Sequence, residues 1–168
     1  GDISNMAMIA PFRGLTYNFK KLGDMSRLVA PPYDVINEQE QEEYHNAHPN
    51  NVIRLILGRK RSGDSESDNR YIRSAHEMKK WEQEDILVRS EKPAMYLTAH
   101  DYDPGDGKGK RTRWGLITLV RIEDEGSKVI LPHEKTFSAH KDDRLRLMKT
   151  CNAQLSQVFG LFDDTANI

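Results

Sequence analysis

The stretch that decides the fold class is AMYLTAHDYDPGDGKGKRTRWGLITLVRI, residues 94–122. Its two ends, Ala94–Tyr102 and Thr112–Ile122, carry the aromatic, aliphatic and β-branched residues that favour strands. Between them, Asp103–Lys110 is rich in glycine and holds one proline, a composition typical of a long hairpin loop. Two adjacent strands with no helix between them predict an antiparallel hairpin. They argue against a regular βαβ sheet and favour an α+β fold.

Helical patterns lie on both sides of this hairpin. Asn37 followed by Glu40 resembles a capping box, and either Ser67 or Asp68 would cap the next helix. Apolar residues recur behind these positions, and again near the end of the chain, at spacings of three and four. These patterns predict three helices, over about 38–47, 69–84 and 140–151.

Shorter apolar segments predict the remaining strands, over residues 9–17, 52–57, 129–131 and 156–162. The aliphatic, β-branched run Val52–Leu57 is a candidate buried strand. Leu28–Ile36 contains the pair Pro31-Pro32 and is expected to be a rigid extended loop, because proline fixes its own φ and restricts the preceding residue. The whole pattern predicts a small mixed sheet with flanking helices.

The length and composition suit one globular domain. The chain has 168 residues, of which 37% are hydrophobic and 30% are charged, so we expect a single domain over 1–168 with a real core. Because the sequence stops directly after a predicted strand, we expect it to be the N-terminal part of a longer protein. Cys151 is the single cysteine, which excludes an internal disulfide framework and a cysteine-rich zinc site.

Charge and hydropathy limit the classes of partner that we expect for this protein. No apolar run approaches the roughly 18 residues that span a membrane, and the first residues lack the pattern of a signal peptide. We therefore expect a cytoplasmic protein with no membrane partner. The net charge of −1 argues against nucleic acid as a partner. We interpret the basic run Lys108–Arg113 as a solvated face, with nucleic-acid contact as the alternative that a steep salt dependence of binding would reveal. The sequence does not indicate an oligomeric state.

Residues 131–149, LPHEKTFSAHKDDRLRLMK, hold the densest group of side chains that could carry chemistry. They lead from a predicted strand into a predicted helix, whose N-terminus offers unpaired N–H groups and a partial positive charge to a phosphate. Lys141 and Arg144 are three residues apart and so lie on neighbouring positions of one helical face. Arg144 can bind phosphate through two N–H donors, and Ser138 or Asp142 would cap the helix.

Two interpretations of this segment remain open. His133 or Glu134 could act as an acid, a base or a Mg²⁺ ligand next to the phosphate. Alternatively, Asp142 and Asp143 only complement the helix dipole, while the cations beside them are solvated.

Two further segments supply candidate substrate-binding residues. The stiff loop at 29–36 ends in Tyr33-Asp34 and could hold a carboxylate in fixed geometry beside a ligand, although Asp34 could equally cap a turn while Tyr33 packs. Arg13 and Asn18, in PFRGLTYN, are weaker candidates, because each of these residue types is more often a structural hydrogen-bonding group.

Five motifs cover most of the chain: PFRGLTYN at 11–18, APPYDVI at 30–36, PNNV at 49–52, PHEKT at 132–136 and KDDRLRL at 141–147. In order and spacing they resemble a bacterial and archaeal family that carries only a domain-of-unknown-function name. Members of that family are usually longer than this chain, which agrees with the expectation of an N-terminal part.

That family is in turn similar in outline to the superfamily that contains ParB, sulfiredoxin and the free-serine kinase. The resemblance implies a small α+β fold that binds nucleotide phosphates at a loop leading into a helix. By this analogy, His140, Lys141, Asp143 and Arg144 occupy the place of the phosphate-binding motif.

The chain also departs from each of these relatives. Sulfiredoxin needs a cysteine in its phosphate motif, whereas Cys151 lies about two helical turns beyond Arg144. ParB carries a G-E-R-R motif and a helix-turn-helix domain, and neither is visible in this sequence. The serine kinase pairs an aspartate with a histidine and an arginine, and His140, Asp143 and Arg144 supply the same residue types in a different order.

The leading hypothesis is a nucleotide-dependent phosphotransferase that acts on a small hydroxylated molecule such as an amino acid, with Mg²⁺ and ATP, ADP or another nucleotide. Lys141 and Arg144 would hold the phosphates, Glu134 would bind Mg²⁺ or act as base, and Asp34 would orient the acceptor hydroxyl. Phosphoryl transfer depends mainly on positioning and charge neutralisation, which these residue types supply.

Two other hypotheses use the same residues. A non-catalytic module would bind a nucleotide or another anionic metabolite there and would show binding without turnover. A metal-assisted hydrolase would use His133, Glu134 and His140, and would hold a transition metal tightly.

Overall fold

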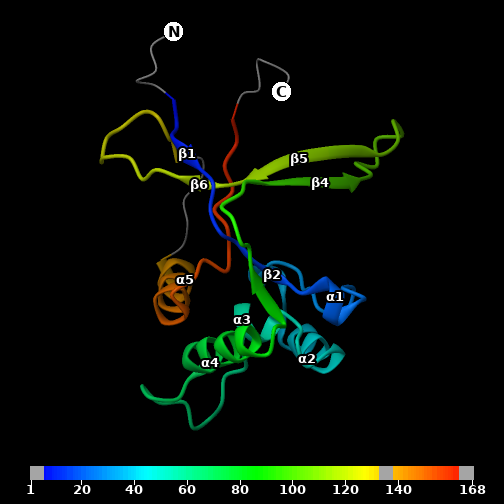
Figure 1. Ribbon diagram of the computed structural model, residues 1–168, viewed down its shortest axis with the longest axis vertical. Coiled ribbons are helices and arrows are strands. Elements are labelled where there is room, and N and C mark those ends of the chain that lie inside the picture. The colour runs from blue at the N-terminus through cyan, green and yellow to red at the C-terminus, as the bar shows by residue number, and fades with distance from the viewer. Residues whose placement is uncertain (1–5, 133–137, 163–168) are drawn as a thin grey trace. The chain divides into compact units, whose positions relative to one another are not determined.

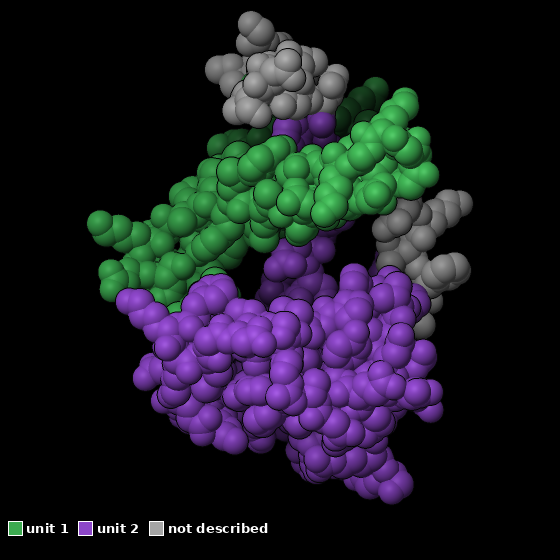
Figure 2. Space-filling view, turned by 90° about the vertical axis from the view of Figure 1, so that its right-hand side faces the viewer, with its two compact units in different colours: residues 1–16, 88–135 green, residues 17–87, 136–168 purple. Residues whose placement is uncertain are grey.

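The computed structural model describes residues 6–132 and 138–162. It has an α+β fold with short helices and small two-stranded sheets (Figure 1). The chain divides into two compact units (Figure 2). Unit 1 comprises Gly1–Thr16 and Val88–Lys135, and unit 2 comprises Tyr17–Leu87 and Thr136–Ile168. No helix within the described ranges has both the length and the apolar character needed to cross a membrane.

Unit 2 is built from helices. In chain order they are α1 (Phe19–Leu22), the 3-10 helix η2 (Tyr33–Val35), α2 (Glu38–Ala47), α3 (Ile53–Ile56), α4 (Arg70–Gln83) and α5 (Ser138–Cys151). The capping box predicted at the start of α2 is confirmed. Glu40 N donates to Asn37 Oδ1 over 3.0 Å, and Asn37 N donates to Glu40 Oε2 over 2.9 Å. This reciprocal pair satisfies two backbone donors that the first turn would otherwise leave unpaired.

The helix predicted over 69–84 is confirmed as α4, but its cap differs from the prediction. Asn69, rather than Ser67 or Asp68, precedes the first helical residue. Its Oδ1 accepts hydrogen bonds from the backbone N–H groups of Tyr71 and Ile72, over 3.1 and 3.2 Å. Asparagine is among the best N-cap residues because its side-chain oxygen reaches the first free N–H groups.

The prediction of a buried strand at 52–57 is wrong, because this run forms the short helix α3. The cause lies in Asn51, which is fully buried. Its Oδ1 accepts from Ile53 N over 2.9 Å, which turns the chain into the helix. Its Nδ2 donates to the carbonyls of Arg27 and Val29, over 2.8 and 3.0 Å. A short apolar run fits either a strand or a helix, and here a buried polar side chain decides between them.

Within the described residues, all the buried hydrophobic side chains lie in unit 2: Leu28, Ile53, Leu55, Met78, Trp81, Ile86 and Leu147. Trp81 is fully buried, and its ring centroid lies 6.1 Å from that of Tyr17. Its Nε1 donates to Glu77 Oε1 over 2.9 Å, so the buried indole keeps a hydrogen-bond partner. The apolar spacing seen in the sequence thus marks the inner face of α4.

Unit 1 contains the predicted hairpin. Strand β4 (Tyr96–Tyr102) pairs antiparallel with β5 (Arg111–Ile117), in a register that runs from Tyr96 opposite Ile117 to Tyr102 opposite Arg111. Strand β1 (Ile9–Ala10) pairs antiparallel with β6 (Leu119–Val120). The predicted strand 112–122 is therefore divided at Thr118, whose Oγ1 donates to the Ala10 carbonyl over 2.8 Å.

A third pair joins β2 (Leu15–Tyr17) to β3 (Leu87–Arg89), and the boundaries between the two units fall within these two strands. The strands predicted at 129–131 and 156–162 are wrong. A strand needs a hydrogen-bonded neighbour, and these segments pair with no strand in the part of the chain that is described.

Candidate functional site

The centre of the candidate site is the carboxylate of Asp143 on α5. It accepts a hydrogen bond from Tyr71 Oη over 2.6 Å and from Arg144 Nε over 2.9 Å. Arg70 Nη2 and Arg144 Nη2 also donate to it. The side chains of Arg70, Asp143 and Arg144 are only 16–18% exposed. Because Arg70 and Tyr71 open α4, this carboxylate ties the start of α4 to α5.

Arg144 extends the contacts to two more segments. Its Nη1 donates to the carbonyl of Ile56, the last residue of α3, over 2.9 Å. Its guanidinium carbon lies 3.7 Å from the centroid of the Tyr33 ring in η2. A planar guanidinium can donate hydrogen bonds from its edges while its face stacks on an aromatic ring. We call Tyr33, Arg70, Tyr71, Asp143 and Arg144 the Asp143 cluster.

The surroundings of Asp143 favour its ionised form. Burial by itself would raise the pKa of this carboxyl group. The hydrogen bonds from Tyr71 and Arg144, together with the positive charges of Arg144 and Arg70, outweigh burial and hold the pKa below its ordinary value. Asp143 is therefore a carboxylate at neutral pH.

Two sequence motifs that were predicted separately meet at this cluster. Tyr33 belongs to APPYDVI and Arg144 to KDDRLRL, and their side chains are in direct contact. The ring of His140 lies 6.0 Å from that of Tyr33, measured between centroids. Asp34 and Lys141, which follow Tyr33 and His140 in the chain, are exposed. The structure thus brings Tyr33 together with His140 and Arg144, and Asp34 and Lys141 are their exposed neighbours in the chain.

Three guanidinium groups lie at the two aromatic rings of the Asp143 cluster. The guanidinium carbons of Arg70 and Arg146 lie 4.9 and 4.8 Å from the centroid of the Tyr71 ring, and that of Arg144 lies over the Tyr33 ring. Asp143, the one carboxylate within the cluster, pairs with two of these groups. Guanidinium groups gathered in this way attract anions.

The geometry refines the predicted role of Arg144. Its Nε and Nη2 edge, the edge suited to a bidentate phosphate contact, binds Asp143, and its Nη1 binds the Ile56 carbonyl. A phosphate would have to compete with these partners. Arg144 is therefore placed to hold the site together, whereas its neighbour Lys141 on the preceding turn is exposed.

Some predicted residues fall elsewhere. His133 and Glu134 lie outside the described residues. Ser138 is the first residue of α5. The prediction that Asp142 could cap this helix is wrong, because Asp142 lies in its second turn, where the backbone N–H groups already have helical partners.

Arg13 belongs to unit 1 and makes structural contacts there. Its Nε donates to the carbonyl of Ser90 over 2.7 Å, and its own carbonyl accepts from Arg89 Nη1 over 3.2 Å. The neighbouring Gly14 N donates to Tyr96 Oη over 2.8 Å. These bonds fix the chain around PFRGL, and the role of Arg13 in binding substrate stays a prediction.

Arg70 and Tyr71 were missed by the sequence analysis. Tyr71 was counted on the apolar face of its helix, and nothing in the sequence links Arg70 to a carboxylate 73 positions away. The available signal was the presence of acidic residues in the apolar-periodic helix 140–151, since an acid that turns inward requires a cation or a hydroxyl as partner.

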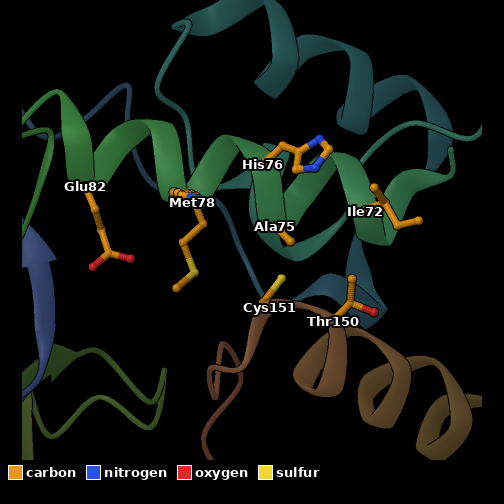
Figure 3. A pocket seen from close by; sticks show the side chains of 8 residues that line it. Ile72, Ala75, His76, Met78, Glu82, Thr150 and Cys151 are labelled. Carbon is orange, nitrogen blue, oxygen red and sulfur yellow. The ribbon is translucent and has the colours of Figure 1, made fainter. Parts of the chain in front are cut away.

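A separate groove of about 400 Å³ lies between α4 and the end of α5. Figure 3 shows Ile72, Ala75 and Met78 on its α4 side, with the Cys151 side chain pointing towards Ala75. Burial raises the pKa of the Cys151 thiol. None of the predicted site residues lines this groove. Within residues 6–132 and 138–162, no group of three or more His, Cys, Asp or Glu side chains could hold a metal ion.

Comparison with known proteins identifies the family. The comparisons with curated proteins and with solved structures found no match. A family model described as "Protein of unknown function (DUF1015)" matches residues 9–168, which is nearly the whole chain. The expectation of a family of unknown function is thereby confirmed, while the individual motifs stay predictions. The chain belongs to the DUF1015 family.

Proposed function

We propose that this protein is a nucleotide-dependent phosphotransferase whose phosphate site lies beside the Asp143 cluster. The observation that carries the proposal is the contact of Arg144 with Tyr33, which joins the segments 33–34 and 140–144 that hold the exposed Asp34, His140 and Lys141. The guanidinium groups at the rings of Tyr33 and Tyr71 support an anionic ligand.

In this proposal the buried and exposed residues have different roles. Asp143 and Arg144 are positioning residues, because their hydrogen-bonding groups are engaged within the protein. Lys141 and His140 contact the phosphates of ATP. Mg²⁺, which arrives with the nucleotide, neutralises phosphate charge. Glu134 remains the proposed Mg²⁺ ligand.

The transfer step uses Asp34. The hydroxyl oxygen of a small acceptor attacks the γ-phosphorus of ATP, the bond from that phosphorus to the β,γ-bridging oxygen breaks, and ADP leaves. Asp34 accepts the hydroxyl proton. A carboxylate in this role contributes roughly 10²–10⁴-fold to the rate.

Calorimetric titration of Mg-ATP, Mg-ADP and Mg-CTP tests the phosphate site. We expect Lys141→Ala to weaken nucleotide binding about tenfold or more, since hydrogen bonds to charged groups contribute roughly 1.5–3 kcal/mol. Lys149→Ala, an exposed lysine at the far end of α5, is the matched control and should bind as the unmodified protein does. Arg144→Ala is a poor probe, because it also removes contacts to α3 and η2.

Turnover is tested separately by ADP formation from ATP with small hydroxylated acceptors, free serine first. We expect Asp34→Asn to lose turnover while it retains nucleotide affinity, and Asp142→Asn to keep both. An absence of saturable binding with every nucleotide would contradict the proposal.

A non-catalytic anion-binding module is the second candidate. It is favoured by the full engagement of Asp143, the one carboxylate of the cluster, with Arg70, Tyr71 and Arg144. Lys141-dependent nucleotide binding without turnover on any acceptor would select this function.

A further inference from the structure

His45 in the last turn of α2 is a buried polar side chain. It is only 6% exposed. Neither Nδ1 nor Nε2 makes a well-formed hydrogen bond with a residue that the structure describes, although the backbone of Leu57 lies close enough to favour the charged ring. Arg54 Nε on α3 also lacks a partner among these residues. These are the three buried side-chain atoms of the described chain that lack a well-formed hydrogen bond. A buried polar atom without a partner destabilises the folded state, so a cluster of them calls for an explanation.

The charges around His45 are unfavourable for a proton on its ring. Arg54 Nη2 donates to the His45 backbone carbonyl over 2.7 Å. Arg59, which follows α3, faces the same region, as does Glu42 one turn earlier on α2. Glu42 already forms a two-point ion pair with Arg59, with Arg59 Nε 2.6 Å from Glu42 Oε1. A protonated His45 would thus meet two cations and a carboxylate that is already paired.

Burial is the largest cause that lowers the pKa of His45, followed by the charges of Arg59 and Arg54. The charge of Glu42 and the backbone of Leu57 oppose them, and the resulting pKa is about 4. The histidine is therefore neutral in the folded protein down to this pH, whereas in an unfolded segment it titrates near its ordinary value of 6.5. At a pH between about 4 and 6.5, the form in which α2 and α3 have separated therefore binds more protons at His45 than the folded form.

The contacts that Arg144 makes outside α5 lie in α3, which meets His45, and in η2, which precedes α2 in the chain. Ile56, whose carbonyl accepts from Arg144 Nη1, is the last residue of α3. Tyr33, which lies under the Arg144 guanidinium, is in η2, and η2 leads directly into the capping box of α2. Separation of α2 from α3 would therefore disturb both contacts of Arg144.

We propose that His45 is an acid-sensitive lock: while neutral it allows α2 and α3 to pack, and when protonated it favours their separation and the release of Arg144 from Ile56 and Tyr33. The further claim that this lock regulates the phosphate site rests on the proposed function. The existence of the lock does not rest on it, because the lock is a property of the protein without ligand.

Amide hydrogen exchange over pH 5–8, corrected for the intrinsic exchange rate, tests the lock. With pKa values of about 4 and 6.5 for the closed and open forms, the opening constant of α2, α3 and η2 should rise roughly 30-fold from pH 8 to pH 5. Amides of α4 near Trp81 should not follow this change. His45→Phe occupies the buried position without titrating and should abolish the pH dependence.

The controls separate the possible outcomes. His76→Gln removes an exposed histidine on α4 and should keep the response. If His45→Phe does not fold, His45→Leu serves in its place. The same pH dependence in the unmodified protein and in the His45 variant would overturn the lock, as would an equal loss of protection throughout α4.

The same exchange measurement with added Mg-ADP separates this inference from the proposed function. Mg-ADP at pH 5 should restore protection in α2 and α3, because a ligand that binds only the closed form stabilises it. If Mg-ADP has no effect on exchange at any pH, the link to a phosphate site fails. The pH dependence measured without ligand still decides whether the lock exists.

Discussion

At the scale of single residues, Asp143 is the group on which most contacts converge. It accepts hydrogen bonds from three side chains in a largely buried position. Removing one partner of a buried ion pair leaves the remaining charge uncompensated. We expect Asp143→Asn to lower the free energy of unfolding by about 3 kcal/mol at pH 7, measured by urea denaturation.

The pH dependence of this effect has a defined sign. Because the folded pKa of Asp143 lies below its ordinary value of 3.8, the stabilisation is fully present above that value and is lost as the pH falls through the folded pKa. Asp142→Asn is the control and should change stability by no more than about 0.5 kcal/mol, since this exposed neighbour lies outside the cluster. Equal stability of the two variants would refute a structural role for Asp143.

The sequence predicted part of this site. His140, Asp143 and Arg144 stood out because mixed charges crowd one loop-to-helix junction, and Tyr33 because a proline pair precedes it. Arg70 was out of reach, since its partner lies 73 positions away and a single sequence carries no record of such pairs. The Arg144 side chain points towards Asp143 and Ile56 because of tertiary packing, which a single sequence does not reveal either.

At the scale of elements, the approach of Gly14 to β4 has a testable consequence. A Cβ at Gly14 would lie 2.7 Å from Tyr96 Oη, which is far too close. We expect Gly14→Ala to destabilise the protein measurably. The cost should be smaller in a Tyr96→Phe background, which removes the nearest atom, but it should not vanish, because Cζ at 2.9 Å remains. Thermal unfolding of the four proteins in this double-mutant cycle measures the coupling.

Gly63→Ala is the matched control for this cycle, because a Cβ there meets nothing within 4 Å. Its effect should be small or slightly stabilising, through reduced freedom of the unfolded chain. If Gly14→Ala were equally harmless in both backgrounds, the close contact with Tyr96 would be disproved.

The elements differ in how well local sequence predicts them. Helix α2 and the β4–β5 hairpin were predicted because their signals are local: a reciprocal cap in one case, and a glycine-rich loop between apolar runs in the other. Within the predicted strand 52–57, residues 53–56 form a helix that begins at the buried Asn51 side chain. The apolar segments at 129–131 and 156–162 fit a strand pattern, but a strand also needs a partner, and the sequence does not identify one.

At the scale of the whole molecule, the chain has two tryptophans, one in each unit. Trp81 in unit 2 is fully buried, whereas Trp114 in unit 1 is 65% exposed. We expect acrylamide to quench only part of the native fluorescence. Trp114→Phe should remove the accessible part and leave emission that resists quenching until the protein is unfolded. Strong quenching of the folded Trp114→Phe protein would contradict the burial of Trp81.

The division into two units was not predicted. Each unit is assembled from two separated stretches of chain, so no linker or change in composition marks the boundary in the sequence. The α+β class was predicted, because the order of helices and strands already excludes a regular βαβ arrangement. The expectation of a single domain over 1–168 and the similarity to the ParB and sulfiredoxin superfamily stay predictions.

The central claim is that the residues joined by the Arg144–Tyr33 contact form a phosphate site. Titration of Mg-ADP into the isotopically labelled protein, followed by amide chemical shifts, tests this most directly. The account predicts saturable shifts confined to residues 33–36 and 140–144, and their loss in Lys141→Ala but not in Lys149→Ala. Saturable shifts elsewhere in the chain, or none at millimolar Mg-ADP, would contradict it.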